Sequence, residues 1–125
     1  MLKKTITYTD YNGVERTEDF YFHFSKAELA EMEMGTAGGY AEMIKKIIAA
    51  QDAPTLIKIF KEIVLKAHGI KSDDGKRFMK SPEIAEAFSQ TEAYSQLFME
   101  LATNSDAAAK FVNGIMPSDL GAANN

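Results

Sequence analysis

Residues 54–68 carry apolar side chains at the spacing of one helix face, and this pattern constrains the fold more than any other. The apolar positions recur at i, i+1, i+4, i+7, i+8 and i+11, and most charged side chains fall outside them. Pro54 suits a first turn, where its missing N–H is no loss. Gly69 is expected to end the helix in the left-handed conformation, and His68 would place a cation near the C-terminal end of the helix dipole. We therefore predict a central amphipathic helix against which the rest of the chain packs. Its apolar face comprises Leu56, Ile57, Phe60, Ile63, Val64 and Ala67.

Two β-branched and aromatic runs flank Asn12-Gly13 and predict an N-terminal β-hairpin. A two-residue loop would pair Tyr11 with Val14 and would put phenylalanines and threonines on the same face. A three-residue loop with Gly13 as a left-handed bulge pairs Asp10 with Val14 and separates the two kinds of side chain. Since a slip of one residue exchanges whole faces, we predict the second register. Its apolar face comprises Leu2, Ile6, Tyr8, Phe20, Phe22 and Phe24.

Cap signals predict further helices on both sides of the central one. Ser25 and Glu28 form a capping box for a helix that ends near Met34. Residues 40–50 have the stripe of a second helix, and Asp74-Gly75 indicates a small second hairpin or a tight turn. The later helix starts are Ser81-Pro82, Thr91, and Ser105 or Asp106.

These elements predict an α+β fold, in which an N-terminal β-hairpin packs on a bundle of five or six short helices. We expect residues 1–117 to form a single domain and residues 118–125 to form a flexible tail. An open hairpin edge, at residues 5–9 or 17–23, could pair with a second copy and give a homo-oligomer.

Composition narrows the function classes. The chain has a net charge of −4 and no cysteine, so it has neither disulfides nor thiolate metal ligands, and nothing steers it as a whole toward nucleic acid. No apolar run approaches the length of a membrane span, and the first ten residues lack the apolar region of a signal peptide. We expect a protein without contact to nucleic acid or membrane.

Candidate catalytic and metal-binding residues are few. The histidines, His23 and His68, lack the spacing of a metal site, and we interpret both as structural or surface residues. Asp73-Asp74-Gly75 suggests calcium, but an EF-hand register would put Ile70 where a carboxylate is required. No nucleophile, base or metal constellation can be assembled, so we predict that the protein is not an enzyme and needs no cofactor.

Three residues instead suggest binding to another protein. Leu65 falls on the polar side of the central helix, and Phe78 and Met79 interrupt a charged loop. Seven methionines add adaptable apolar surface wherever they are exposed. We predict that Leu65, Phe78 and Met79 contribute to a partner-binding groove.

Most of the chain resembles a known family. The segments YTDYNGVERTEDFYFHFSKAELAEME and IKSDDGKRFMKSPEIAEAFSQTEAYSQLFMELATNSDAAAKFVNGIMP are similar to the tail assembly chaperones of long-tailed phages and prophages of Gram-positive bacteria. The resemblance runs over residues 3–117 and lies in whole segments, without a catalytic motif or a functional signature of single residues.

The resemblance implies a non-enzymatic protein that works in the cytoplasm of the infected bacterium. Such proteins bind the tape measure protein, and tail tube subunits as well, and they are absent from the finished virion. Many also occur in a longer form made by ribosomal frameshifting. A tape measure protein is a long helical chain with apolar stripes, which a coat of small acidic domains could keep in solution.

Two other readings remain open. A small structural tail protein or a head–tail completion protein would be present in purified particles, whereas a chaperone would not. A regulatory or nucleic-acid-binding module would bind DNA or RNA at low salt, which the acidic balance disfavours.

Overall fold

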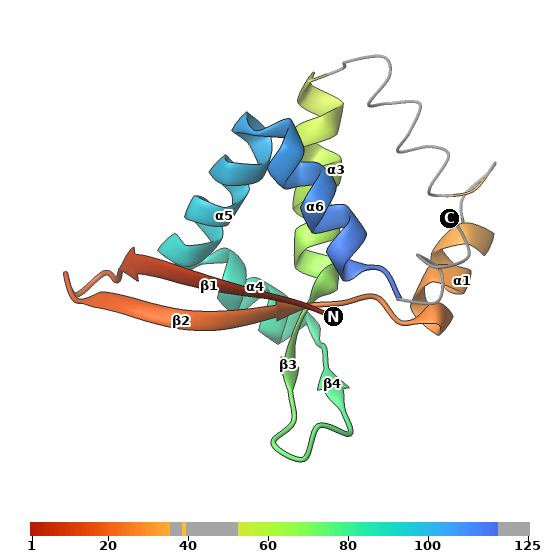
Figure 1. Cartoon of the computed structure of the whole chain (residues 1–125), viewed down its shortest axis with the longest axis horizontal. Coiled ribbons are helices and arrows are strands. Elements are labelled where there is room, and N and C mark those ends of the chain that lie inside the picture. Colours follow the sequence, from red (N-terminus) through yellow and green to blue (C-terminus); the bar gives the residue numbers. More distant parts are fainter. Residues whose placement is uncertain (36–38, 40–52, 118–125) are drawn as a thin grey trace.

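The computed structural model describes residues 1–35, 39 and 53–117, which form an α+β fold as predicted (Figure 1). The described residues form four strands and five helices. The predicted helix at residues 40–50 and the predicted tail at 118–125 lie outside this part of the chain. In order, the elements are β1 (Leu2–Thr9), β2 (Glu15–Phe22), α1 (Lys26–Met34), α3 (Ala53–Ala67), β3 (His68–Lys71), β4 (Phe78–Met79), α4 (Pro82–Ser89), α5 (Glu92–Thr103) and α6 (Ser105–Ile115).

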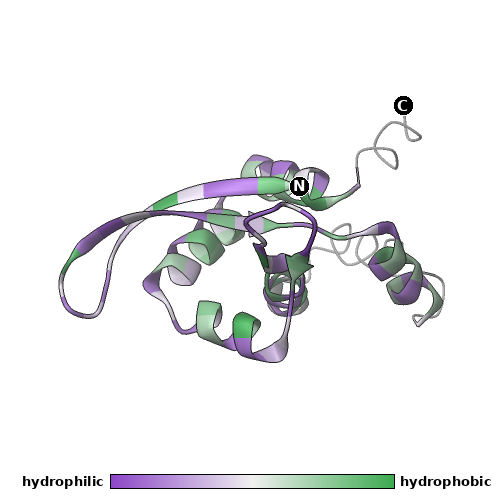
Figure 2. Cartoon of the chain, turned by 90° about the horizontal axis from the view of Figure 1, so that it is seen from below, coloured by the Kyte–Doolittle hydropathy of each residue, from purple (hydrophilic) through white to green (hydrophobic). Residues whose placement is uncertain are grey.

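The first hairpin has the predicted register. Its pairs run from Leu2 and Phe22 to Thr9 and Glu15, and the Asp10 N–H donates to the Val14 carbonyl at 2.9 Å. Gly13 has a φ of +79°, as a left-handed bulge residue requires. Phe22 is completely buried on the apolar face of this hairpin, whereas the stretch around its turn is mainly hydrophilic (Figure 2).

The second hairpin, β3–β4, extends the first into an antiparallel sheet with the order β1-β2-β3-β4. Gly75 has a φ of +75° in its turn, which confirms the turn at Asp74-Gly75. Only two residues of β2 pair with β3, namely Tyr21 with Gly69 and Phe22 with His68. Beyond these pairs the second hairpin turns steeply away from β2 (Figure 1).

This pairing corrects the predicted end of the central helix. His68 and Gly69 do not cap α3 but open β3. A Cβ atom on Gly69 would lie only 2.8 Å from Cε2 of Phe78 and 2.9 Å from the carbonyl oxygen of Met79. Glycine therefore stands here because a ring and a strand approach it closely, and not because a helix needs a left-handed residue.

The core lies where α3, α4, α5 and α6 meet the apolar face of the first hairpin. From α3, Ile59, Ile63, Val64 and Ala67 are buried. Ile57, which periodicity places on the buried face, is 48% exposed, so this part of the predicted stripe is wrong.

The caps of the later helices follow the predicted chemistry with one correction. The hydroxyls of Ser81 and Thr91 accept from backbone N–H groups at the starts of α4 and α5, and the capping box at Ser25 opens α1. The cap of α6 is Asn104, and neither Ser105 nor Asp106. An asparagine side chain accepts hydrogen bonds from the N–H groups of the first turn as well as serine does, so the cap lies one residue before the predicted Ser105.

Candidate partner-binding surface

The structure separates the three residues predicted to bind a partner. Leu65 is half-buried on α3 and lines a cleft of about 320 Å³ between α3 and α4, with Pro82 and Ala85 opposite. Phe78 and Met79 are neighbours in β4, so their side chains point to opposite faces. We call this space the α3–α4 cleft.

Phe78 and Met79 have different surroundings. The Phe78 ring lies against Gly69 and near the His23 ring, with 6.3 Å between centroids. Met79 pairs with Ile70 across β3 and β4, and directly paired residues share a face. Ile70 is 49% exposed, so Met79 stands beside open apolar surface, whereas Phe78 is half-buried against Gly69 on the other face of the hairpin.

Ile70 lies between two further clefts that share Phe20 and His68. One, of about 360 Å³, is mainly apolar and has Ile84, Ala87 and Phe88 of α4 as its wall; we call it the α4 cleft. The other, of about 620 Å³, opens where β3 leaves β2; we call it the strand-edge cleft. Ile70 is not among the residues predicted to bind a partner, although its alternation with His68 across Gly69 is a strand signal.

Acidic side chains predominate at the rims of these two clefts. Glu18, Asp19 and Asp73 line the strand-edge cleft together with one cation, Lys71, and Glu83 lines the α4 cleft. The surface around Ile70 therefore combines an apolar floor with a negative border.

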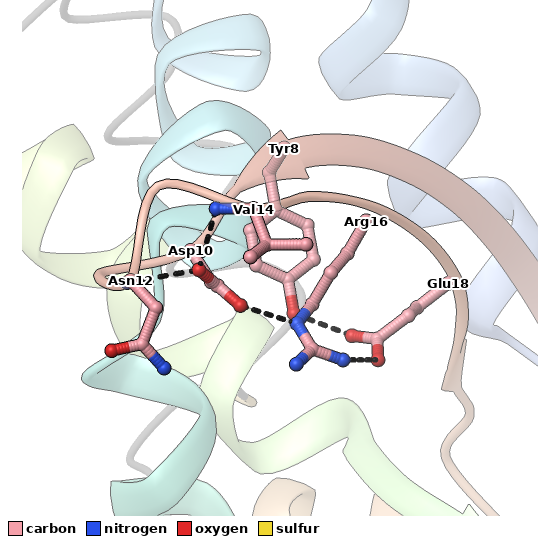
Figure 3. A network of polar contacts seen from close by, with 6 residues as sticks. All are labelled: Tyr8, Asp10, Asn12, Val14, Arg16 and Glu18. Atoms are coloured by element: carbon pink, nitrogen blue, oxygen red, sulfur yellow. Dashed lines mark hydrogen bonds and ion pairs between the residues drawn. The ribbon is translucent and has the colours of Figure 1, made fainter.

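The polar network at the hairpin turn holds β2 in place (Figure 3). Asp10 accepts from the backbone N–H groups of Asn12 at 2.9 Å and Val14 at 3.0 Å, and Arg16 donates to its second oxygen. These contacts lower the pKa of Asp10, and the hydrogen bond from Arg16 has the largest effect. On the same hairpin the Tyr8 hydroxyl donates to Glu18, which raises the pKa of Tyr8. The direction of the β2 edge is thus fixed by several local contacts.

His68 forms the shared floor of the clefts and is 8% exposed. Its ring stacks on Phe88 at a centroid distance of 4.2 Å, and its Nδ1 lies 3.2 Å from the Tyr21 carbonyl, to which it donates as the Nδ1–H tautomer. Burial lowers the pKa of His68, and the Tyr21 contact opposes this only in part. The imidazole is therefore neutral at pH 7, contrary to the cationic helix-end role predicted for it.

Stability should consequently fall in mild acid. The folded protein binds a proton at His68 less readily than the unfolded chain, whose histidine has a pKa of 6.5, so the free energy of unfolding decreases as pH falls through 6.5. The decrease has an upper limit of about 1.4 kcal/mol per pH unit for one histidine. Urea unfolding at pH 7.5 and at pH 5.5 measures it.

A His68→Phe variant provides the control, because it keeps a ring against Phe88 and removes the titrating group. Burial also lowers the pKa of His23, so the variant should retain a smaller slope. Equal slopes in the variant and the wild type would contradict the assignment to His68.

Lys80 joins the second hairpin to the start of α1. Its Nζ donates to the His23 carbonyl at 2.7 Å and to Glu28 Oε2 at 2.6 Å, and it lies 4.7 Å from the centroid of the Phe24 ring. Burial alone would raise the pKa of Glu28, but the hydrogen bonds from Lys80 and Ser25 outweigh it and hold that pKa below its ordinary value.

Within residues 1–35, 39 and 53–117, no three His, Asp or Glu side chains come together as a metal site would require. The helices of the same residues include none with the length and apolar character to cross a bilayer. The surface features that remain are clefts with apolar floors, which suit contact with another polypeptide.

Comparison with known proteins places the chain in a family. The family described as phage tail assembly chaperone matches residues 1–125, the whole length of the sequence. No curated protein and no solved structure matches the chain. Tail assembly chaperones serve tail building in the host cell, which agrees with the resemblance seen in the sequence. Because the family matches the full length of the sequence, the chain belongs to the phage tail assembly chaperone family.

Proposed function

We propose that this protein binds the tape measure protein, and tail tube subunits as well, while the tail is built. The observation that carries the proposal is the open apolar surface around α4, on a chain of the tail assembly chaperone family. The surface comprises the α3–α4 cleft with Leu65 and the α4 cleft with Ile70 and its neighbour Met79.

The physical need is to cover apolar segments. A tape measure protein is a long chain, and its apolar stripes are exposed to aggregation until the tube surrounds them. A small acidic domain that lends an apolar cleft would cover such a stripe, and its net charge of −4 would keep the complex dispersed. Leu65 and Met79 are the residues we assign to this contact, and Phe78 supports the strand that carries Met79.

The proposal places the protein in the cytoplasm of a Gram-positive host infected by a long-tailed phage, and outside the finished particle. We infer that it acts without catalysis and without a cofactor, because covering and releasing a partner needs contact surface alone. A structural tail protein is the alternative function, and it would remain in purified particles.

Capture of tape measure fragments tests the proposal. Immobilised wild-type protein should retain fragments that carry apolar stripes, and Leu65→Asp and Met79→Asp should each reduce capture about tenfold or more, because a charge then has to be buried at the contact. Met99→Asp is the matched control, since Met99 is a 54% exposed methionine on α5, away from the clefts.

Thermal unfolding of each variant checks that the fold is intact, and Leu65→Ser serves if Leu65→Asp does not fold. Capture by both variants at the level of the Met99→Asp control would remove Leu65 and Met79 from the contact. A wild-type protein that captures no fragment would overturn tape measure binding.

A further inference from the structure

The outer edge of β2 is open along most of its length. Among the described residues, β3 pairs only with Tyr21 and Phe22, and residues 15–20 have no strand on that side. At about 3.4 Å per residue these six positions span about 20 Å, the length of an ordinary strand.

The backbone groups at this edge point outward in a defined alternation. The Asp10 N–H donates to the Val14 carbonyl, so even-numbered residues of the second strand direct their groups toward β1. The Tyr21 carbonyl instead accepts from His68 on the other side, as the direction of odd-numbered residues requires. Thr17 and Asp19 share that direction, so their N–H and C=O groups face the open edge, where Asp19 also lines the strand-edge cleft.

Apolar surface lies directly beside this edge. Phe20 is half-buried and Ile70 is 49% exposed, and both line the strand-edge cleft and the α4 cleft. Edge strands that are protected against pairing carry inward charges or are covered, and Arg16 and Glu18 are charges of this kind in the half of the edge nearer the hairpin turn. Here the edge adjoins a cleft with an apolar floor, which would receive side chains of an added strand.

The charged side chains that line the two clefts indicate which kind of segment would bind at this edge. Glu18, Asp19 and Asp73 line the strand-edge cleft and Glu83 lines the α4 cleft, against Lys71 in the lining and Arg16, which lies 4.0 Å from Glu18. A strand with carboxylates would be repelled there, whereas lysine or arginine would be attracted.

We propose that an extended segment of the partner protein adds to the open edge of β2 as a further strand, with apolar residues alternating with lysine or arginine. In an added β-strand, successive side chains point to opposite faces of the sheet. Apolar side chains of the segment then enter the α4 cleft beside Phe20 and Ile84, and basic side chains lie on the other face near Asp19. This inference rests on the proposed function and adds the chemistry of the bound segment to it.

Synthetic peptides test the proposal without the partner protein. The probe is an acetylated and amidated peptide of about seven residues in which lysine alternates with isoleucine, and fluorescence anisotropy measures its binding to the full chain. A peptide with glutamate in place of lysine should bind at least about tenfold more weakly, and binding of the lysine peptide should weaken as salt is raised.

Backbone methylation separates strand addition from contact by side chains. Two further peptides carry N-methyl groups, one on the isoleucines and the other on the lysines. Because only alternate residues of an added strand bond to β2, one of the two should lose about tenfold in affinity or more, and the other should bind as the parent does.

A pair of protein variants tests the same edge from the other side. Thr17→Pro removes an outward N–H, and Thr17→Ala removes the side chain and keeps the N–H, so only the first should weaken the lysine peptide. The methylated peptides keep the test decisive if Thr17→Pro does not fold.

Three outcomes would overturn the proposal: equal affinity for the lysine and glutamate peptides, equal affinity for the two methylated peptides, or no binding of the lysine peptide. Self-association that the lysine peptide reverses would also overturn it, since a second copy would then be the occupant. Tape measure capture by a protein that does not bind the peptide would refute strand addition and leave the proposed function standing.

Discussion

Replacing Phe22 by alanine is expected to lower the free energy of unfolding by about 4 kcal/mol. The Phe22 side chain is completely buried, and its ring packs edge-on against the rings of Phe111 at 5.2 Å and Phe88 at 5.7 Å between centroids. Alanine would leave a cavity where the first hairpin, α4 and α6 meet, and the neighbouring rings could not close it without leaving their own contacts. Urea unfolding measures the loss, and the melting temperature should fall by roughly 15 °C.

Tyr11→Ala is the matched control for this prediction. Tyr11 is an aromatic residue of the same hairpin and is 76% exposed at its turn, so its loss should change stability by about 0.5 kcal/mol or less. If the two variants unfold at the same urea concentration, the first hairpin is not packed on the helices as described.

Replacing Lys80 by methionine should cost about 2–3 kcal/mol. Methionine keeps the length and the apolar stem of the side chain, so the change chiefly removes the ammonium group. The His23 carbonyl and the Glu28 carboxylate then lose the donor at 2.7 Å and 2.6 Å, and the attraction to the Phe24 ring is lost as well. The lysine side chain is 21% exposed, so water replaces these contacts only in part.

A second readout separates this contact from a general loss of packing. Without Lys80 the pKa of Glu28 should rise, because the hydrogen bond that helps to lower it is gone. Carboxyl titration by NMR follows that change in the folded protein. Lys76→Met, which removes an exposed lysine of the β3–β4 turn, should leave both stability and the Glu28 titration unchanged; a similar effect of the two variants would contradict the role of Lys80.

Local signals are sufficient for much of this fold. The register of the first hairpin follows from the need to put Phe20 and Phe22 on one face, because the wrong loop length would expose them. Ser25, Ser81 and Thr91 mark helix starts since their side chains can satisfy backbone N–H groups that the helix leaves free. These features depend on residues close in sequence, and the structure confirms them.

Contacts between distant residues could not be predicted in this way. Gly69 after an amphipathic helix is typical of a helix end, and only the pairing of β3 with β2 and the Phe78 ring above the glycine show its other use. The two clefts beside Ile70 have the same origin, since their walls come from β2, β3 and α4. Leu65 was predicted from its place outside the helix stripe, and the structure does place it in a cleft, but the partner contact itself stays a prediction.

The Phe24 N–H donates to the Ile115 carbonyl at 2.8 Å, and this contact between the hairpin and the last helix has a consequence for synthesis on the ribosome. The hairpin precedes the helices in the chain, so the rings that enclose Phe22 leave the exit tunnel after it, first Phe88 of α4 and later Phe111 of α6. Until α6 has been translated, the nascent chain therefore leaves Phe22 without the Phe111 ring that packs on it, and apolar surface exposed in this way is prone to aggregation. A member of the phage tail assembly chaperone family therefore exposes apolar surface of its own while it is being made.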